Sequence, residues 1–133
     1  RLNDLANAVY EGLAFQSRLM VDRLEEISGV KINKIIAIGG PALNLHWMQI
    51  KAAVLGRPLV ITRIENAASF GAALLAGVGT GVYKSVSSAL DLVKPRRRKI
   101  NPNPRACDFY QTAYEKYRKI YPVLRPILRE FYG

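Results

Sequence analysis

The chain has 133 residues, of which 50% are hydrophobic, and it carries a formal net charge of +10 at pH 7. This length supports one globular core and is too short for two well-developed domains. A single cysteine, the absence of a long apolar run and the absence of a signal-peptide pattern give no support to a disulfide framework, a membrane span or secretion, so we expect a cytoplasmic protein.

The first predicted element is a long amphipathic helix from Leu2 to about Ile27, where apolar residues recur at spacings of three and four. Gly12 lies inside this helix at a cost of about 1 kcal/mol relative to alanine, which predicts that a neighbouring element approaches closely there. Gly29 can end the helix in the left-handed conformation. Because the chain opens with Arg1 directly inside this pattern, we expect it to be a fragment of a longer protein.

The next predicted elements are a strand, a helix and a second strand. Residues 34–38 form a short β-branched run, which predicts a buried strand that ends at the turn Gly39-Gly40-Pro41. A helix follows, with Asn44 as its N-cap and Gly56 as its stop. Residues 59–61 then predict the second strand.

A helix of small residues, 67–77, follows the second strand. Its glycines lie within and after a helix and do not follow a strand, which disfavours a dinucleotide-binding loop. Close packing through Gly71, Ala72, Ala73 and Ala76 is the better interpretation. The order α-β-α-β-α predicts an α/β layer structure in which helices cover a sheet.

The second half of the chain carries weaker signals. Residues 85–92 predict a short helix, and residues 94–104 combine a basic cluster with prolines, which is typical of a solvated connector. No aromatic residue is interleaved in this cluster to stack bases, so we do not expect it to bind nucleic acid. Residues 105–121 predict a helix with a tyrosine stripe that serves packing. We expect Pro122 to end or kink it before a last helical segment.

The turn Gly39-Gly40-Pro41 is the most informative local feature for function. A strand that leads into paired glycines and then into a helix exposes backbone N–H groups, which bind phosphate groups. Asn44 adds a donor and an acceptor for a base or a ribose. Taken alone, the turn is a weak signal, because strand–Gly-Gly–helix turns are common simply as connectors.

Other familiar catalytic sets are absent from the sequence. One histidine, His46, and one cysteine, Cys107, do not make a metal site, and we interpret His46 as a helix-surface residue. None of the ten acidic residues is named as a catalytic base. Glu65 is the most interesting of them, because it closes the second strand near the expected position of a cleft. Helix-start electrostatics explain it nearly as well.

Several motifs occur in a fixed order that resembles the C-terminal domain of FGGY carbohydrate kinases. They are Glu11-Gly12, Gly39-Gly40-Pro41-Ala42, the run Trp-Met-Gln-Ile-Lys-Ala at 47–52, Leu55-Gly56-Arg57-Pro58 and the run 71–79. The resemblance covers about residues 5 to 85. It implies part of an actin-like, ribonuclease-H-like ATPase fold, in which two domains close on a cleft, with the sugar bound mainly by the first domain and ATP largely by the second.

The resemblance also implies site residues and cofactors. By the family's pattern, Gly39, Gly40 and Pro41 lie against the nucleotide, and Asn44 meets the adenine side, with ATP and Mg²⁺ as cofactors. The family commonly has glycine or alanine where Pro41 stands, and proline removes one N–H that could donate to ATP. The family's catalytic aspartate and phosphate-binding hairpin belong upstream. We therefore assign no catalytic or metal-binding residue and expect little or no kinase activity from this chain alone.

The leading hypothesis is the nucleotide-binding part of an ATP-dependent sugar kinase, formed by one truncated domain over residues 1–133, with a connector at 94–104 and a helical tail at 105–133. A xylulose-like pentulose is the favoured substrate, while ribulose, gluconate and glycerol stay open because the missing N-terminal domain binds the sugar. One alternative is a basic module that binds nucleic acid through residues 96–99, and another is a non-catalytic actin-like interaction domain. We expect no membrane partner, and exposed apolar surface makes a homodimer a further hypothesis.

Overall fold

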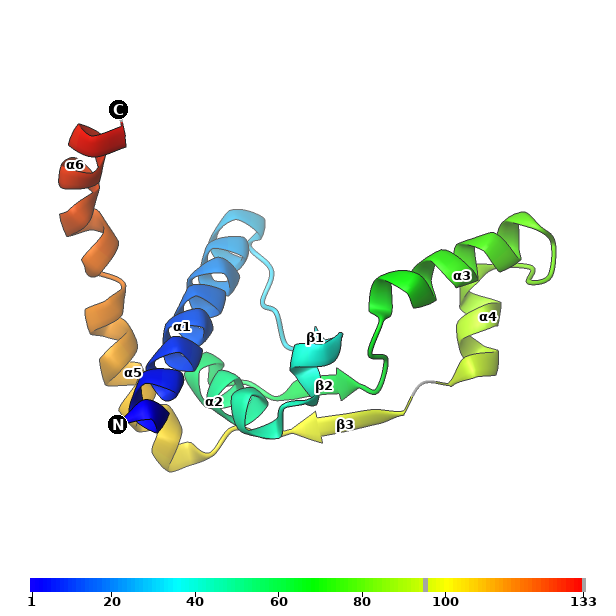
Figure 1. Ribbon diagram of the computed structural model, residues 1–133, viewed down its shortest axis with the longest axis horizontal. Helices are drawn as coiled ribbons and strands as arrows, with labels where there is room; N and C mark the ends of the chain where they lie inside the picture. The colour runs from blue at the N-terminus through cyan, green and yellow to red at the C-terminus, as the bar shows by residue number, and fades with distance from the viewer. Residues whose placement is uncertain (95, 133) are drawn as a thin grey trace.

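The computed structural model describes residues 1–94 and 96–132, and it has the predicted mixed α/β class (Figure 1). The elements are α1 (Leu2–Ser28), β1 (Ile35–Ala37), the 3-10 turn η1 (Gly40–Leu43), α2 (Leu45–Leu55), β2 (Leu59–Thr62), α3 (Ala67–Gly79), α4 (Val86–Val93), β3 (Arg97–Ile100), α5 (Pro104–Tyr117) and α6 (Ile120–Tyr132). Pro95 of the predicted connector and Gly133 of the predicted tail lie outside the described residues.

The three strands form one sheet in the order β1-β2-β3. β1 runs parallel to β2, and β3 runs antiparallel to β2 with Ile100 opposite Leu59. The interpretation of residues 97–100 as a solvated connector is therefore wrong for the backbone. β3 satisfies the hydrogen bonds of the β2 edge and buries Ile100, while its basic side chains stay exposed, as is common on edge strands.

Among the described residues, the core packs against one face of the sheet. Side chains alternate along a strand, so Ile35 and Ala37 pack against the core, whereas Ile36 points the other way and is 51% exposed. The predicted strand is thus confirmed, but it is half-buried where full burial was expected. The core itself lies where α2 packs between α1 and α5, and its members are Ala14, Phe15, Ala42, Trp47, Met48, Ile50, Ala52, Val54, Leu55, Leu59, Ile61, Ile100 and Tyr114.

The predicted ends of α1 and α2 are confirmed. Gly29 ends α1 with φ 67°, and Gly56 ends α2 with φ 62°, both in the left-handed region that glycine adopts without steric cost. The Asn44 side chain accepts a hydrogen bond from the Trp47 N–H at 3.1 Å and so caps α2. The prediction for Gly12 is wrong, because a Cβ added there would meet no atom within 4 Å.

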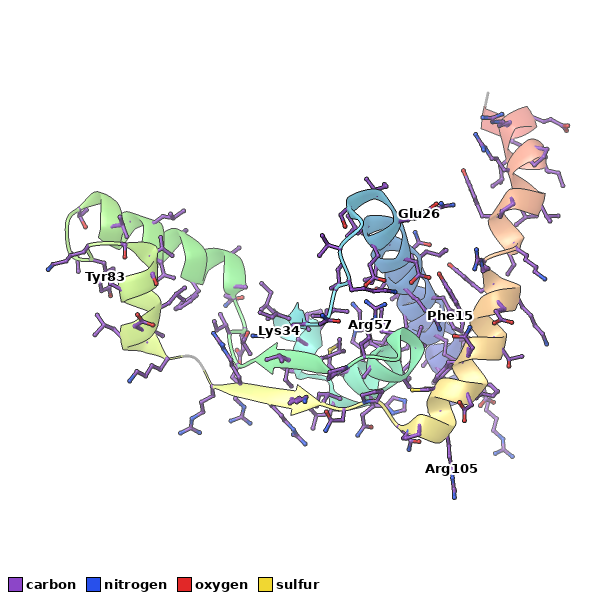
Figure 2. The ribbon with its side chains drawn as sticks, turned by 180° about the vertical axis from the view of Figure 1, so that it is seen from behind. Phe15, Glu26, Lys34, Arg57, Tyr83 and Arg105 are labelled. Carbon is purple, nitrogen blue, oxygen red and sulfur yellow. The ribbon has the colours of Figure 1, made fainter. Side chains whose placement is uncertain are left out.

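The tyrosine stripe of α5 packs against α1, as predicted. The Phe15 ring lies 6.1 Å from the ring of Tyr110, 6.1 Å from that of Tyr114 and 5.1 Å from that of Tyr117, measured between centroids. Figure 2 shows Phe15 on the side of α1 that faces α5. Tyr121 does not take part, because it lies on α6 and is exposed.

Two of these tyrosines also anchor their hydroxyl groups on α1. The Tyr110 O–H donates to Glu11 at 2.9 Å, and the Tyr114 O–H donates to Asp22 at 2.6 Å. Burial, followed by the hydrogen bond to the carboxylate, raises the pKa of each tyrosine to about 12. Both therefore stay neutral donors at neutral pH, which supports a role in packing.

The last helical break differs from the prediction at Pro122. α5 ends at Tyr117 and α6 begins at Ile120, so Pro122 lies in the first turn of α6. A proline is tolerated there because the first N–H groups of a helix have no partner within the helix.

α3 and α4 extend away from the sheet (Figure 1). The predicted packing through small residues of α3 is wrong for Gly71, where an added Cβ meets no atom within 4 Å, and for Ala72, Ala73 and Ala76, which are exposed. Contact occurs instead at Gly77, where an added Cβ would lie 2.5 Å from the Tyr83 ring. A larger residue at position 77, in the last turn of α3, would therefore require the Tyr83 ring to shift.

Several helical faces are left uncovered by the described residues. The solvent-accessible surface is 9905 Å², whereas a compact monomer of this mass exposes roughly 7,000 Å². Much of the excess is apolar and lies on α1 and on α6, where the following residues are exposed: Leu2, Leu5, Val9, Leu13, Met20, Leu24, Ile27, Ile120, Val123, Leu124, Ile127, Leu128 and Phe131.

Candidate functional site

The glycine turn follows β1 directly and is tied to the end of β2. Gly39 has φ 88°, which favours glycine, and its N–H donates to the Ile64 carbonyl at 3.3 Å. The Ala42 N–H is also used, since it donates to the Gly39 carbonyl at 3.1 Å. Pro41 has no N–H, so the Gly40 N–H is the backbone donor of this turn that has no backbone acceptor among the described residues. A Cβ on Gly40 would meet no atom within 4 Å, so a ligand can reach this backbone.

Asn44 holds the helix that follows the turn. Its Oδ1 accepts from the Trp47 N–H, and its Nδ2 donates to the Tyr10 hydroxyl of α1 at 3.2 Å. One N–H of the amide is left for a further acceptor. The capping role expected from the sequence is therefore confirmed, and the contact with a base stays a prediction.

An aromatic and polar surface beside Asn44 was not predicted from the sequence. The Tyr10 ring stacks on the Trp47 ring with centroids 5.1 Å apart, and it meets the His46 ring edge-on at 6.3 Å. His46 Nε2 lies 3.0 Å from Asn7 Oδ1, which confirms His46 as a surface residue. The signal available in the sequence was the spacing of Asn7 and Tyr10, which places both on one side of α1.

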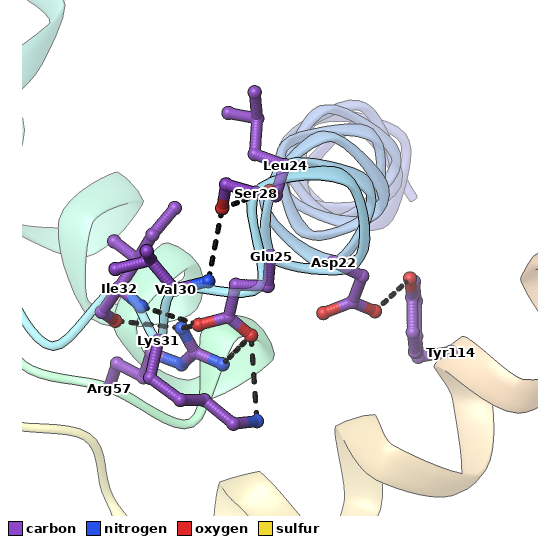
Figure 3. Close-up of polar contacts among 9 residues, drawn as sticks. All are labelled: Asp22, Leu24, Glu25, Ser28, Val30, Lys31, Ile32, Arg57 and Tyr114. Carbon is purple, nitrogen blue, oxygen red and sulfur yellow. Dashed lines mark hydrogen bonds and ion pairs between the residues drawn. The ribbon is translucent and has the colours of Figure 1, made fainter.

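A cluster of charged groups fixes the loop that leads into β1 (Figure 3). Arg57 Nη1 donates to Glu25 Oε1 at 2.6 Å, and Arg57 Nη2 donates to Glu25 Oε2 at 2.9 Å. The same guanidinium donates to the Ile32 carbonyl at 2.7 Å, while the Ile32 N–H donates to Glu25 at 2.6 Å. This closed set of bonds joins the end of α1, the loop and the end of α2. It therefore fixes the position of β1 and of the glycine turn that follows β1.

The cluster also has an electrostatic signature. The hydrogen bond from Arg57, and next the one from the Ile32 N–H, lower the pKa of Glu25 from 4.5 to about 2. Lys31 Nζ lies 3.7 Å from Glu25 Oε2 and adds a smaller contribution. The same pairing raises the pKa of Arg57, so both groups stay charged over the whole neutral range.

Acid should weaken this cluster in a defined window. Because the folded-state pKa of Glu25 is depressed, its stabilising effect is fully present above pH 4.5 and is lost as the pH falls towards about 2. We expect the melting temperature to fall across this range, and the fall to be shallower in Glu25→Gln. Thermal unfolding at several pH values checks this. Glu26→Gln is the matched control, because Glu26 pairs only with Arg23 on the exposed side of α1. A pH profile of Glu25→Gln identical to that of the unsubstituted chain contradicts the assignment.

The other residues considered from the sequence, Glu65 and Cys107, lie apart from any group of metal-ligating side chains among the described residues. Glu65 is exposed at the end of β2, and its carbonyl lies 4.0 Å from the position of a Cβ on Gly39. Cys107 is a free, half-buried thiol of α5. Within residues 1–94 and 96–132, no three histidine, cysteine, aspartate or glutamate residues are grouped to hold a metal ion. No helix in those ranges is long and apolar enough to cross a membrane.

Comparison with known proteins gives one consistent result. Residues 1–80 match the family model described as the C-terminal domain of the FGGY family of carbohydrate kinases. The L-xylulose/3-keto-L-gulonate kinase of Escherichia coli K12 is 34% identical over 121 residues, which cover 91% of this chain and 24% of that protein. An autoinducer-2 kinase of Photorhabdus laumondii is 29% identical over 117 residues, which cover 88% and 22% of the two chains.

The fold is also that of a solved structure. The xylulose kinase from Rhodospirillum rubrum superposes with a TM-score of 0.75 at 28% identity, over 94% of this chain and 25% of that one. The chain therefore spans about a quarter of the length of the proteins that it matches.

Proposed function

Because this chain belongs to the FGGY family of carbohydrate kinases, we propose that it is the nucleotide-binding C-terminal part of an ATP-dependent sugar kinase. The predicted family and the predicted partial actin-like ATPase fold are confirmed. The two alternatives from the sequence, a nucleic-acid module and a non-catalytic interaction domain, receive no support from the comparisons.

The observation that carries the nucleotide proposal is the open backbone at Gly40. Its N–H has no backbone acceptor among the described residues, it lies between the end of β1 and the start of α2, and nothing would obstruct a ligand there. A free backbone N–H in a glycine turn is a donor to oxygen atoms, so a phosphate or ribose oxygen is the expected acceptor. We propose that Gly39, Gly40, Pro41 and Asn44 contact ATP. Gly39 and Pro41 offer only van der Waals surface, and Asn44 offers its remaining amide N–H.

The proposed cofactor is ATP carried with Mg²⁺. The described residues offer the Gly40 N–H and the Asn44 amide to the nucleotide, but they include no group of three metal-ligating side chains. We therefore propose that Mg²⁺ arrives with the phosphates of ATP. The ion would neutralise charge during phosphoryl transfer, and this chain's own part is to hold and orient the nucleotide.

The proposed acceptor is a xylulose-like pentulose. Two of the proteins that this chain resembles are named as an L-xylulose/3-keto-L-gulonate kinase and a xylulose kinase. The chain covers about a quarter of each, so we propose that the sugar is bound mainly by the remaining three quarters of such a protein. This chain alone is then expected to have little or no activity. A cytoplasmic location and a homodimer, formed through the exposed apolar faces of α1 and α6, stay predictions.

Trp47 reports directly on the proposed site. It is the single tryptophan of the chain, and its N–H is bonded to Asn44. We expect titration with Mg-ATP to change its fluorescence to saturation. Asn44→Ala should weaken this binding about tenfold, because one charge-assisted or polar contact and the geometry of the turn are lost together.

The matched control for this experiment is Asn103→Ala. Asn103 caps α5 through its Oδ1, which accepts from the Arg105 N–H at 3.0 Å, so its replacement removes a cap of the same kind away from the turn. Affinity for Mg-ATP should change by no more than about twofold. The proposal is wrong if the unsubstituted chain shows no saturable response or if both variants lose affinity equally.

A further inference from the structure

Four arginines are brought together where β2 ends and β3 begins. The Arg63 N–H donates to the Arg96 carbonyl at 3.1 Å, which continues the antiparallel pairing of the two strands beyond the sheet. In that pairing Arg97 lies opposite Thr62 and Arg98 opposite Ile61. Residues more than thirty positions apart in the sequence therefore share one end of the sheet, next to the start of α2.

A cavity of about 550 Å³ opens at this end of the sheet, and Arg63, Arg96, Arg97 and Arg98 belong to its lining. Because side chains alternate along a strand, Arg63, Arg96 and Arg98 lie on the same face as Ile61, and Arg97 lies on the other face. Glu65 is the one carboxylate in its lining. Within residues 1–94 and 96–132, no carboxylate lies within 4.0 Å of any of these four guanidinium groups. The positive charge in this lining exceeds that of the single carboxylate, which is unfavourable for the protein alone and attracts anions into the hollow.

The chemistry of the lining defines the ligand. A guanidinium group presents a rigid fork that binds phosphate through two hydrogen bonds, and the three such groups on the face of Ile61 suit a ligand with more than one phosphate. Leu43, Leu45 and Ile61 supply an apolar part of the wall, which suits a carbon skeleton. The volume lies within the range of roughly 300–1,000 Å³ that is usual for small-molecule sites.

We propose that this cavity binds a small organic anion with two or more phosphate groups, at a site separate from the nucleotide turn. None of Gly39, Gly40, Pro41 and Asn44 belongs to its lining, although Leu43 and Leu45 flank Asn44. A nucleic acid is a poorer fit, because no aromatic side chain lines the cavity to stack a base.

Inorganic pyrophosphate is the probe, and its binding to this chain is measured by isothermal titration calorimetry at low salt. We expect saturable binding that weakens about tenfold in Arg63→Gln and in Arg98→Gln, because each removes a charged fork. Both arginines are exposed, so the fold should be retained, which circular dichroism verifies. Lys99→Gln is the matched control. Lys99 is the next residue on β3, it carries the same charge, and it does not line the cavity; its loss should change the affinity by no more than about twofold.

Two further arms separate this site from the nucleotide site. Pyrophosphate binding should be unchanged in Asn44→Ala, and the affinity for Mg-ATP reported by Trp47 fluorescence should be unchanged in Arg63→Gln. A parallel loss of pyrophosphate and Mg-ATP affinity in either variant would overturn the proposal, because the cavity would then be the phosphate end of the nucleotide site. Absence of saturable binding would also overturn it. So would equal weakening by Lys99→Gln, which indicates diffuse surface charge, or tighter binding of a single-stranded oligonucleotide than of pyrophosphate.

Discussion

Phe15→Ala is expected to lower the free energy of unfolding by about 3–5 kcal/mol, the usual cost of deleting a buried aromatic ring. Phe15 is 7% exposed, and its ring contacts three tyrosine rings of α5. The substitution leaves a cavity between α1 and α5, which the neighbouring rings fill only in part. Because small domains have a total stability of about 5–15 kcal/mol, the loss is a large fraction of it.

Urea denaturation followed by circular dichroism measures this loss. Phe131→Ala is the matched control, since Phe131 is 77% exposed on α6 and its replacement should change stability by no more than about 0.5 kcal/mol. If Phe15→Ala is unfolded in the absence of urea, Phe15→Leu is used instead. It keeps most of the apolar volume, so its loss of unfolding free energy should be smaller and measurable. Equal effects at positions 15 and 131 would mean that the contact between α1 and α5 does not hold the fold together.

Arg57→Ala should lower the melting temperature by about 5–10 °C, because it removes charge-assisted hydrogen bonds and leaves the Glu25 carboxylate without its partner. The side chains of Glu25 and Arg57 are 11% and 24% exposed, so water replaces the lost bonds only in part. Arg57→Lys keeps the charge but loses the two parallel hydrogen bonds. Its melting temperature should therefore lie between that of Arg57→Ala and that of the unsubstituted chain. The loop before β1 should exchange its amide hydrogens faster in both variants.

The control for Arg57 is Arg23→Ala. Arg23 and Glu26 also form a 2.6 Å ion pair, but their side chains are 72% and 66% exposed. Exposed pairs contribute little, so the melting temperature should change by no more than about 2 °C. If Arg23→Ala and Arg57→Ala have the same effect, the cluster around Glu25 does not fix the entry into β1.

The sequence was sufficient wherever a structure depends on neighbours along the chain. The ends of α1 and α2 follow from Gly29, Asn44 and Gly56, because a left-handed glycine and an N-cap amide act within one turn of the helix. The order of short motifs was likewise sufficient to identify the family.

Prediction from the sequence failed where an element depends on a partner that is distant along the chain. Residues 97–100 are mostly basic and lack the alternation of a strand, and they form β3 because the open edge of β2 supplies hydrogen bonds and a place for Ile100. The close approach expected at Gly12 and the packing expected at Gly71 also failed, because a glycine in a helix does not reveal whether another element lies beside it.

The candidate sites divide in the same way. The glycine turn and the capping role of Asn44 are local, and the sequence by itself determined them. The bonds of Glu25 to Arg57 and the grouping of Arg63 with Arg98 were decided only by the tertiary structure. The physical reason is that hydrogen bonds within a turn or a helix end join residues a few positions apart, whereas ion pairs and strand pairing join groups that become neighbours only once the chain has folded.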